Sequence, residues 1–128
     1  MKMKNLAATY SMLVGISMIA MWTSFYFANA IPELKTEPIR IGLHITAEIA
    51  TGVSLIIGAF RLYKNREWGV KAFLVSMGML LYTSIVSPGY YAERGVMEFV
   101  LIFAILIIVS VAFVILSFIK TREFHASS

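Results

Sequence analysis

Long hydrophobic runs divide this chain into four segments separated by short polar stretches. The runs cover about residues 6–30, 39–63, 70–86 and 96–119. An α-helix of about 20 apolar residues crosses the hydrocarbon core of a bilayer. Inside lipid, such a segment must satisfy its own backbone hydrogen bonds. The pattern therefore predicts an all-α integral membrane protein, in which residues 1–128 form a single domain: an antiparallel four-helix bundle with short loops.

Polar residues and prolines mark the predicted loops. Pro32 and Pro38 break the helix twice between the first two runs, and Pro38 suits the first turn of the next helix. Residues 61–71 form a second, strongly basic loop. The stretch from Ser87 to Tyr90, with proline and glycine at its centre, predicts a tight turn. Residues 120–128 are expected to form a short, frayed tail.

The first run could be a secretory signal or a retained span. Ala28-Asn29-Ala30 resembles the small-x-small cleavage site of a signal sequence. However, an apolar run of about 24 residues exceeds the roughly 7–15 of a signal core, and its last third is bulky. Retention as the first membrane span is therefore the favoured interpretation.

The distribution of basic residues predicts the orientation. Eight of the 11 Lys and Arg residues lie before residue 6, within residues 61–71 or in the tail, and three (Lys35, Arg40 and Arg94) lie on the other side. The positive-inside rule then places both termini in the cytoplasm. We expect the protein in the plasma (cytoplasmic) membrane. The net charge of +4 is thus explained as a topology signal and not as a sign of nucleic-acid binding. The chain lacks cysteine, which excludes disulfides and thiolate chemistry.

The second span carries the unusual chemistry. Arg40, His44 and Glu48 follow each other at i, i+4 and i+8, so all three lie on one side of the helix. A charged residue at the centre of a membrane helix costs roughly 2.5–3.5 kcal/mol on insertion scales. This side of the helix is therefore expected to meet protein, water or a ligand, while the opposite, wholly apolar side meets lipid.

Depth suggests which residues could join this polar side. At about 1.5 Å per residue, Glu48 lies roughly 13 Å below the outer end of its helix, near the midplane. Aromatic and polar residues of the other spans reach similar or shallower levels. The predicted outward-facing pocket comprises Trp22, Tyr26, Asn29, Arg40, His44, Glu48, Tyr82 and Glu98, with Tyr90 and Tyr91 at its mouth.

Four interpretations of this pocket remain open. In the favoured one, the pocket binds a ligand, proton or cation, including the polar head of a lipid or quinone, with Glu48 as the titrating centre and His44 as its partner. Alternatively, the three residues form a satisfied polar ladder in a structural or assembly subunit. A metal site would use His44, Glu48 and Glu98. An intramembrane enzyme is the least favoured, because no nucleophile motif is present. No cofactor is assigned.

Small residues suggest how the spans meet. Ala7, Ser11 and Gly15 repeat every fourth residue on the first span, and Ala50, Ser54 and Gly58 do so on the second. Such stripes let helix backbones approach closely. Because four short spans bury little surface, we also expect a homo-oligomer or a larger membrane complex.

Overall fold

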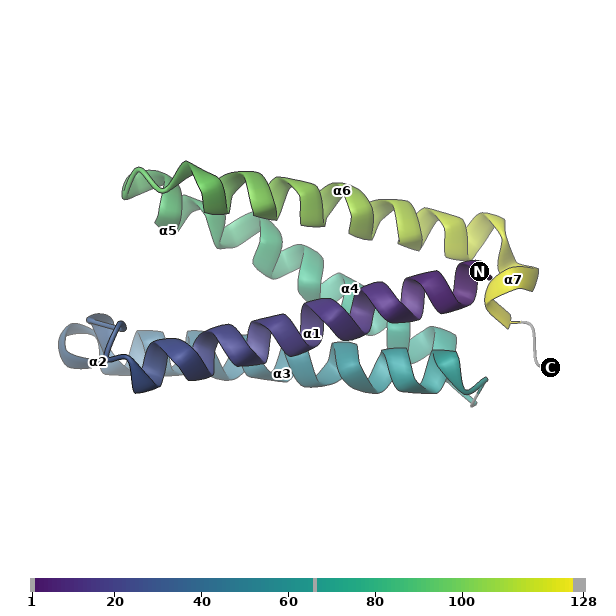
Figure 1. The fold of residues 1–128 in the computed structure, drawn as a ribbon, viewed down its shortest axis with the longest axis horizontal. Coiled ribbons are helices and arrows are strands. Elements are labelled where there is room, and N and C mark those ends of the chain that lie inside the picture. Colours follow the sequence, from purple (N-terminus) through teal and green to yellow (C-terminus); the bar gives the residue numbers. More distant parts are fainter. Residues whose placement is uncertain (1, 66, 126–128) are drawn as a thin grey trace.

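The computed structural model describes residues 2–65 and 67–125, apart from the side chain of His125. Four helices in it are long and apolar enough to cross a membrane, which indicates an integral membrane protein. Figure 1 shows that they run in alternating directions along the chain. In chain order the elements are α1 (Met3–Phe27), α2 (Glu33–Thr36), α3 (Pro38–Tyr63), α4 (Gly69–Val86), α5 (Pro88–Glu93), α6 (Met97–Ile119) and α7 (Thr121–His125).

The predicted spans agree closely with the long helices, and the differences lie at their ends. Helix α1 ends at Phe27, three residues before the predicted end, because Asn29 turns the backbone into the left-handed region (φ 54°). The predicted tight turn at Ser87 is wrong. Ser87 keeps a helical backbone (φ −65°, ψ −34°), and Pro88 starts the short helix α5. The tail is also more ordered than predicted, since α7 follows α6 directly; residues 126–128 lie outside the described part of the chain.

Helices α1 and α3 lie side by side, and two glycines let them approach closely (Figure 1). A Cβ atom on Gly15 would lie only 2.7 Å from the backbone oxygen of Gly52, so no larger residue fits without displacement. One turn earlier, the Ser11 hydroxyl donates to the Leu55 carbonyl oxygen across 2.8 Å. Lipid is as apolar as a leucine side chain, so close packing and hydrogen bonds hold membrane helices together.

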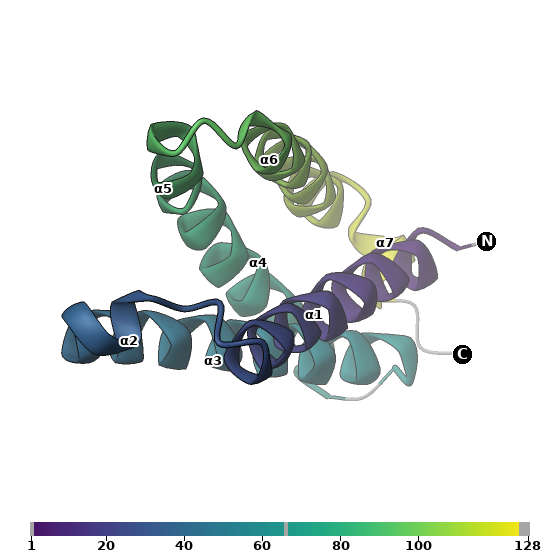
Figure 2. The ribbon, with the colours of Figure 1, turned by 60° about the vertical axis from the view of Figure 1, so that its left-hand side comes forward.

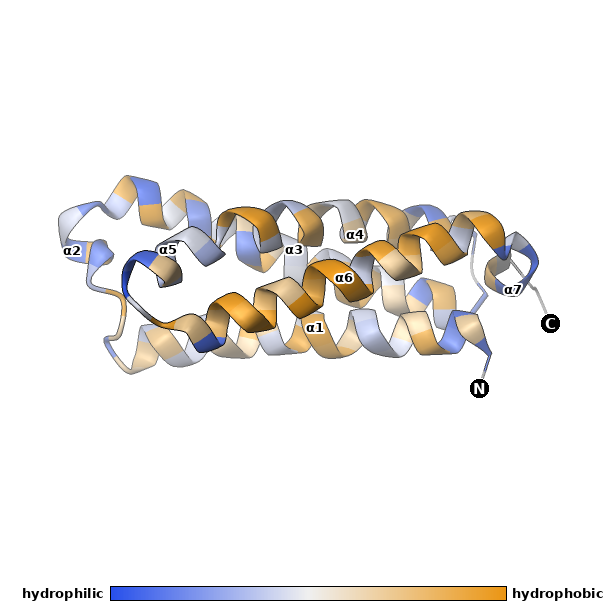
Figure 3. Ribbon diagram, turned by 90° about the horizontal axis from the view of Figure 1, so that it is seen from above, coloured by the Kyte–Doolittle hydropathy of each residue, from blue (hydrophilic) through white to orange (hydrophobic). Residues whose placement is uncertain are grey.

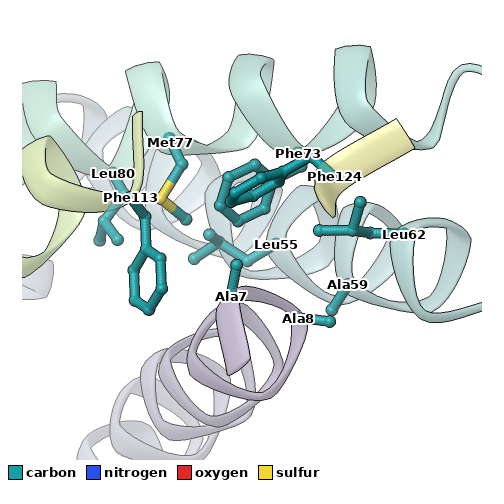
Figure 4. Close-up of a cluster of buried hydrophobic side chains, with 10 residues drawn as sticks. All are labelled: Ala7, Ala8, Leu55, Ala59, Leu62, Phe73, Met77, Leu80, Phe113 and Phe124. Carbon is teal, nitrogen blue, oxygen red and sulfur yellow. The ribbon is translucent and has the colours of Figure 1, made fainter. Parts of the chain in front are cut away.

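The buried hydrophobic core lies at one end of the molecule, which we call the closed end. Side chains from five helices meet there, and α7 contributes the buried Phe124, whose ring centroid is 6.1 Å from that of Phe73 (Figure 4). Near the same end, the Tyr10 hydroxyl lies 2.8 Å from the Ser110 hydroxyl and so links α1 to α6. The core residues are Ala7, Ala8, Leu55, Ala59, Leu62, Phe73, Met77, Leu80, Phe113 and Phe124.

At the other end, which we call the open end, the helices diverge. Helix α4 packs against α3 but crosses toward α6, and α5 continues along α6 (Figures 1 and 2). Near this end, α6 is held by aromatic stacking of Tyr91 on Phe99, with ring centroids 4.6 Å apart. Hydrophilic residues gather at the two ends of the molecule, while α6 is hydrophobic along most of its length (Figure 3). The divergence leaves room for the cavity described below.

Candidate functional site

A cavity of about 530 Å³ lies at the open end, between α1, α3, α5 and the start of α6. Its size is within the range of roughly 300–1,000 Å³ that is typical of small-molecule sites. The cavity has an apolar and aromatic wall and several ionisable groups. The lining residues are Met21, Trp22, Phe25, Ala30, Ile31, Glu33, Arg40, Ile41, His44, Glu48, Val86, Ser87, Gly89, Tyr90, Tyr91, Glu93, Arg94 and Phe103.

Glu48 is the most deeply placed ionisable group of the cavity. Its side chain is on α3, and only 5% of the residue is exposed. The Trp22 indole N–H donates to Glu48 Oε2 across 3.4 Å, which is a long hydrogen bond. On the other side, the Thr83 hydroxyl of α4 donates to Glu48 Oε1. Helices α1 and α4 thus both hold the carboxyl group through neutral donors.

A chain of hydroxyl groups connects Glu48 to the cavity wall. The oxygens of Thr83 and Ser87 are 3.0 Å apart, one helical turn from each other. A hydroxyl group has a single proton to donate. Since Thr83 donates its proton to Glu48, Ser87 must donate to Thr83. Ser87 itself lines the cavity, so the chain of hydrogen bonds that starts at Glu48 ends at the cavity wall.

His44 lies one turn from Glu48 and also lines the cavity. Its ring packs edge-on against Trp22, with centroids 5.6 Å apart and planes at 73°. The His44 side chain makes no hydrogen bond to the part of the chain that the structure describes. Trp22 thus contacts both His44 and Glu48, two members of the predicted polar ladder.

The mouth of the cavity is bridged by a cluster that joins α2 to α5. The Tyr90 hydroxyl donates to Glu33 Oε1 across 2.5 Å, and Arg94 Nη2 is 3.6 Å from the same oxygen. The Arg94 guanidinium also lies over the Tyr90 ring, 3.7 Å from its centroid. The Tyr90 hydrogen bond, assisted by the positive charge of Arg94, holds the pKa of Glu33 below its usual value although burial opposes this.

Four of the eight predicted site residues line the cavity, namely Trp22, Arg40, His44 and Glu48. Arg40 is exposed and forms an ion pair of 2.8 Å with Glu37. The predicted mouth residues Tyr90 and Tyr91 line the cavity as well.

The structure does not bring Tyr26, Asn29, Tyr82 and Glu98 to the cavity. Tyr26 is 61% exposed and Tyr82 is 73% exposed. One step along a helix rotates a side chain by about 100°, and the cavity side is occupied by Phe25 on α1. Asn29 lies beyond the end of α1 in a left-handed turn.

The proposed metal ligands His44, Glu48 and Glu98 are therefore not gathered. Glu98 is exposed, and its neighbour Phe99 is the residue that packs on Tyr91 of α5. Among the described residues, no three His, Cys, Asp or Glu side chains form a group that could hold a metal ion.

Sequence reasoning missed four polar residues of the site: Glu33, Thr83, Ser87 and Arg94. For two of them a signal was present, because Thr83 and Ser87 are four residues apart and must share one face of a helix. Glu33 and Arg94 lie outside the long helices, where helical periodicity gives no information about contacts.

A family model described as a domain of unknown function (DUF8058) matches residues 1–128. No curated protein and no solved structure matches the chain.

Proposed function

This chain belongs to the family described as a domain of unknown function (DUF8058), and we propose that it holds a small ligand or ion in the cavity at the open end. The observation that supports this most directly is the placement of Glu48. Its carboxyl group is almost fully buried, yet it lies on the wall of a cavity large enough for a small molecule. Ionisable groups inside membrane segments commonly mark substrate or ion pathways.

We further propose that the cavity faces the outer side of the plasma membrane, with both termini in the cytoplasm. The open end contains Lys35, Arg40 and Arg94. The other eight Lys and Arg residues lie before residue 6, within residues 61–71 or in the tail, which the predicted topology places on the opposite side of the membrane. The closed end is filled by the hydrophobic core. A ligand would thus enter from outside or from the outer leaflet. Association into a homo-oligomer or a larger complex remains a separate proposal.

The first experiment is native mass spectrometry of the protein released from a mild detergent. Glu48→Gln is compared with the wild type, and Glu98→Gln is the matched control because its carboxylate is exposed and away from the cavity. We expect a retained mass on the wild type and on the control, and its loss from Glu48→Gln. A mass that all three proteins retain equally, or bare chains in all three, would contradict the proposal.

A structural subunit is the second candidate function, and one observation favours it. Both oxygens of Glu48 already have partners within the chain, from Trp22 and Thr83. In that case Glu48→Gln would lower the unfolding temperature or weaken partner association, and no ligand mass would be seen in the wild type.

A further inference from the structure

The charges around the cavity do not balance. Three carboxyl groups line it, from Glu33, Glu48 and Glu93, against the guanidinium groups of Arg40 and Arg94. Both guanidinium groups are already paired with carboxylates. Arg94 pairs with Glu33, and Arg40 pairs with a carboxylate that does not line the cavity.

Glu48 and Glu93 have no ion-pair partner among the described residues. Glu48 is held by an indole N–H and a hydroxyl group, which are neutral donors. Burying a carboxylate without a counter-charge is costly. The cavity therefore has an uncompensated negative charge when Glu48 is ionised, and either a proton or a cation must neutralise it.

Aromatic rings from three helices also line the cavity. Trp22 and Phe25 come from α1, with their ring planes at 83° to each other. Tyr91 and Phe103 come from α5 and α6, with centroids 6.0 Å apart in a stacked arrangement. The faces of aromatic rings attract organic cations, and this attraction grows when water is excluded.

From the charge balance and the aromatic walls together, we propose that the ligand of this cavity is a hydrophobic organic cation. Its positive charge lies beside Glu48, and its apolar body packs between Trp22 and Tyr91. This inference rests on the proposed function, since it assigns a chemical class to the ligand of the same cavity. Divalent metal ions fit less well, because no group of three His, Cys, Asp or Glu side chains that could hold one is present among the described residues.

Three probes that share a benzyl group separate charge from shape. Benzyltrimethylammonium is cationic, neopentylbenzene is its uncharged carbon analogue, and phenylmethanesulfonate is anionic. Binding is followed by the indole fluorescence of Trp22 in lipid nanodiscs. Trp68→Phe is introduced into every protein, because the chain has two tryptophans and Trp68 lies outside the cavity.

Each probe is titrated into the wild type, Glu48→Gln and Glu98→Gln on this background. The ratio of two variants' affinities for one probe cancels the partition of that probe into lipid. We expect Glu48→Gln to weaken the binding of benzyltrimethylammonium by about 10- to 100-fold, as is typical for a lost hydrogen-bonding or charge contact in a dry site. The binding of neopentylbenzene should stay unchanged, which also shows that the variant is folded, and Glu98→Gln should behave as the wild type.

Other outcomes would overturn the inference in distinguishable ways. Equal effects of Glu48→Gln on the cationic and neutral probes would show an apolar pocket without cation selectivity, and the proposed function would stand. If the wild type binds phenylmethanesulfonate more tightly than benzyltrimethylammonium, the site binds anions, held by the two arginines. If no probe binds, the proposed class of ligand, an organic cation, is refuted. The proposed function is then tested separately by whether the native mass spectra show a retained mass.

Discussion

At the scale of single residues, the Glu33 carboxylate links the stability of the cavity mouth to pH. Its folded pKa is lowered, first by the Tyr90 hydrogen bond and further by Arg94. A group with a lowered folded pKa contributes its full stabilisation above its unfolded pKa, near the usual value of 4.5, and loses it as the pH falls through the lower folded value. The open end should therefore become less stable on acidification below about pH 4.5.

Tyr90→Phe tests this linkage, because it removes the hydroxyl group and raises the pKa of Glu33 toward its usual value. We expect the variant to lose part of the wild type's stability above pH 4.5 and to show a shallower fall below it. Thermal unfolding in detergent across this pH range measures both effects. Tyr26→Phe is the control, since Tyr26 is exposed and outside the cavity. Parallel pH profiles for the wild type and Tyr90→Phe would contradict the assignment.

Helical spacing predicts which side chains share a face, but it does not predict which residues of other helices they meet. His44 and Glu48 share a face through their spacing, and both line the cavity with Trp22. Depth alone gave the wrong partner on α4, because it fixes the level of a residue and not the direction of its side chain. At that level Tyr82 points away, while the adjacent Thr83 bonds to Glu48.

At the scale of elements, the glycine contact between α1 and α3 positions Trp22 relative to Glu48. Gly15→Ala would place a methyl group 2.7 Å from a backbone oxygen that cannot move independently of its helix. We expect a loss of about 1–3 kcal/mol of stability, in the range typical of overpacking. Denaturant or thermal unfolding in detergent measures this loss.

Gly78→Ala on α4 is the matched control for Gly15→Ala. Gly78 is also within a long helix, and a Cβ atom there meets nothing within 4 Å. Alanine is the better helix former by about 1 kcal/mol, so Gly78→Ala should be neutral or mildly stabilising. Equal destabilisation by both changes would show that the close approach of α1 and α3 does not cause the loss of stability in Gly15→Ala.

Hydropathy predicted the long helices because membrane spans are set by length and composition. It did not predict where each helix meets its neighbours. The stripe of Ala7, Ser11 and Gly15 is buried in the structure, whereas Ala50 of the stripe predicted on α3 is exposed. The contact with α1 is made by Gly52, which lies outside that stripe. Helix α5 was missed because proline was interpreted as ending the helix at a turn, although it also suits a first helical turn.

At the scale of the whole molecule, the orientation can be tested because the chain has no cysteine. Lys35→Cys places a thiol on exposed α2 at the open end, and Glu67→Cys places one in the exposed loop after α3. In intact cells, a membrane-impermeant maleimide should label the first variant and not the second. Both should be labelled after permeabilisation. The reverse pattern in intact cells would place the cavity on the cytoplasmic side.

The cavity itself could not be predicted at this scale. Its volume depends on α4 crossing from α3 to α6, and the direction of a helix axis is set by packing across its whole length. Trp22, His44 and Glu48 of the predicted pocket line the cavity, but other parts of its lining come from α5 and from the residues around α2. These short segments contain too few residues for helical periodicity to show which of their side chains face the cavity.

The proline that starts α5 has a mechanical consequence. Pro88 has no N–H group, so the carbonyl group of Ser84 receives no helical hydrogen bond from it. The helical ladder is therefore one hydrogen bond weaker at this junction, although the Ser87 N–H still donates to the Thr83 carbonyl oxygen across 2.8 Å. Beyond Ser87, α5 is held to α2 by the contacts of Tyr90 and Arg94 with Glu33. The direction of α5 relative to α4 thus depends less on the helical ladder at Ser87 and more on the contacts that Glu33 makes with Tyr90 and Arg94.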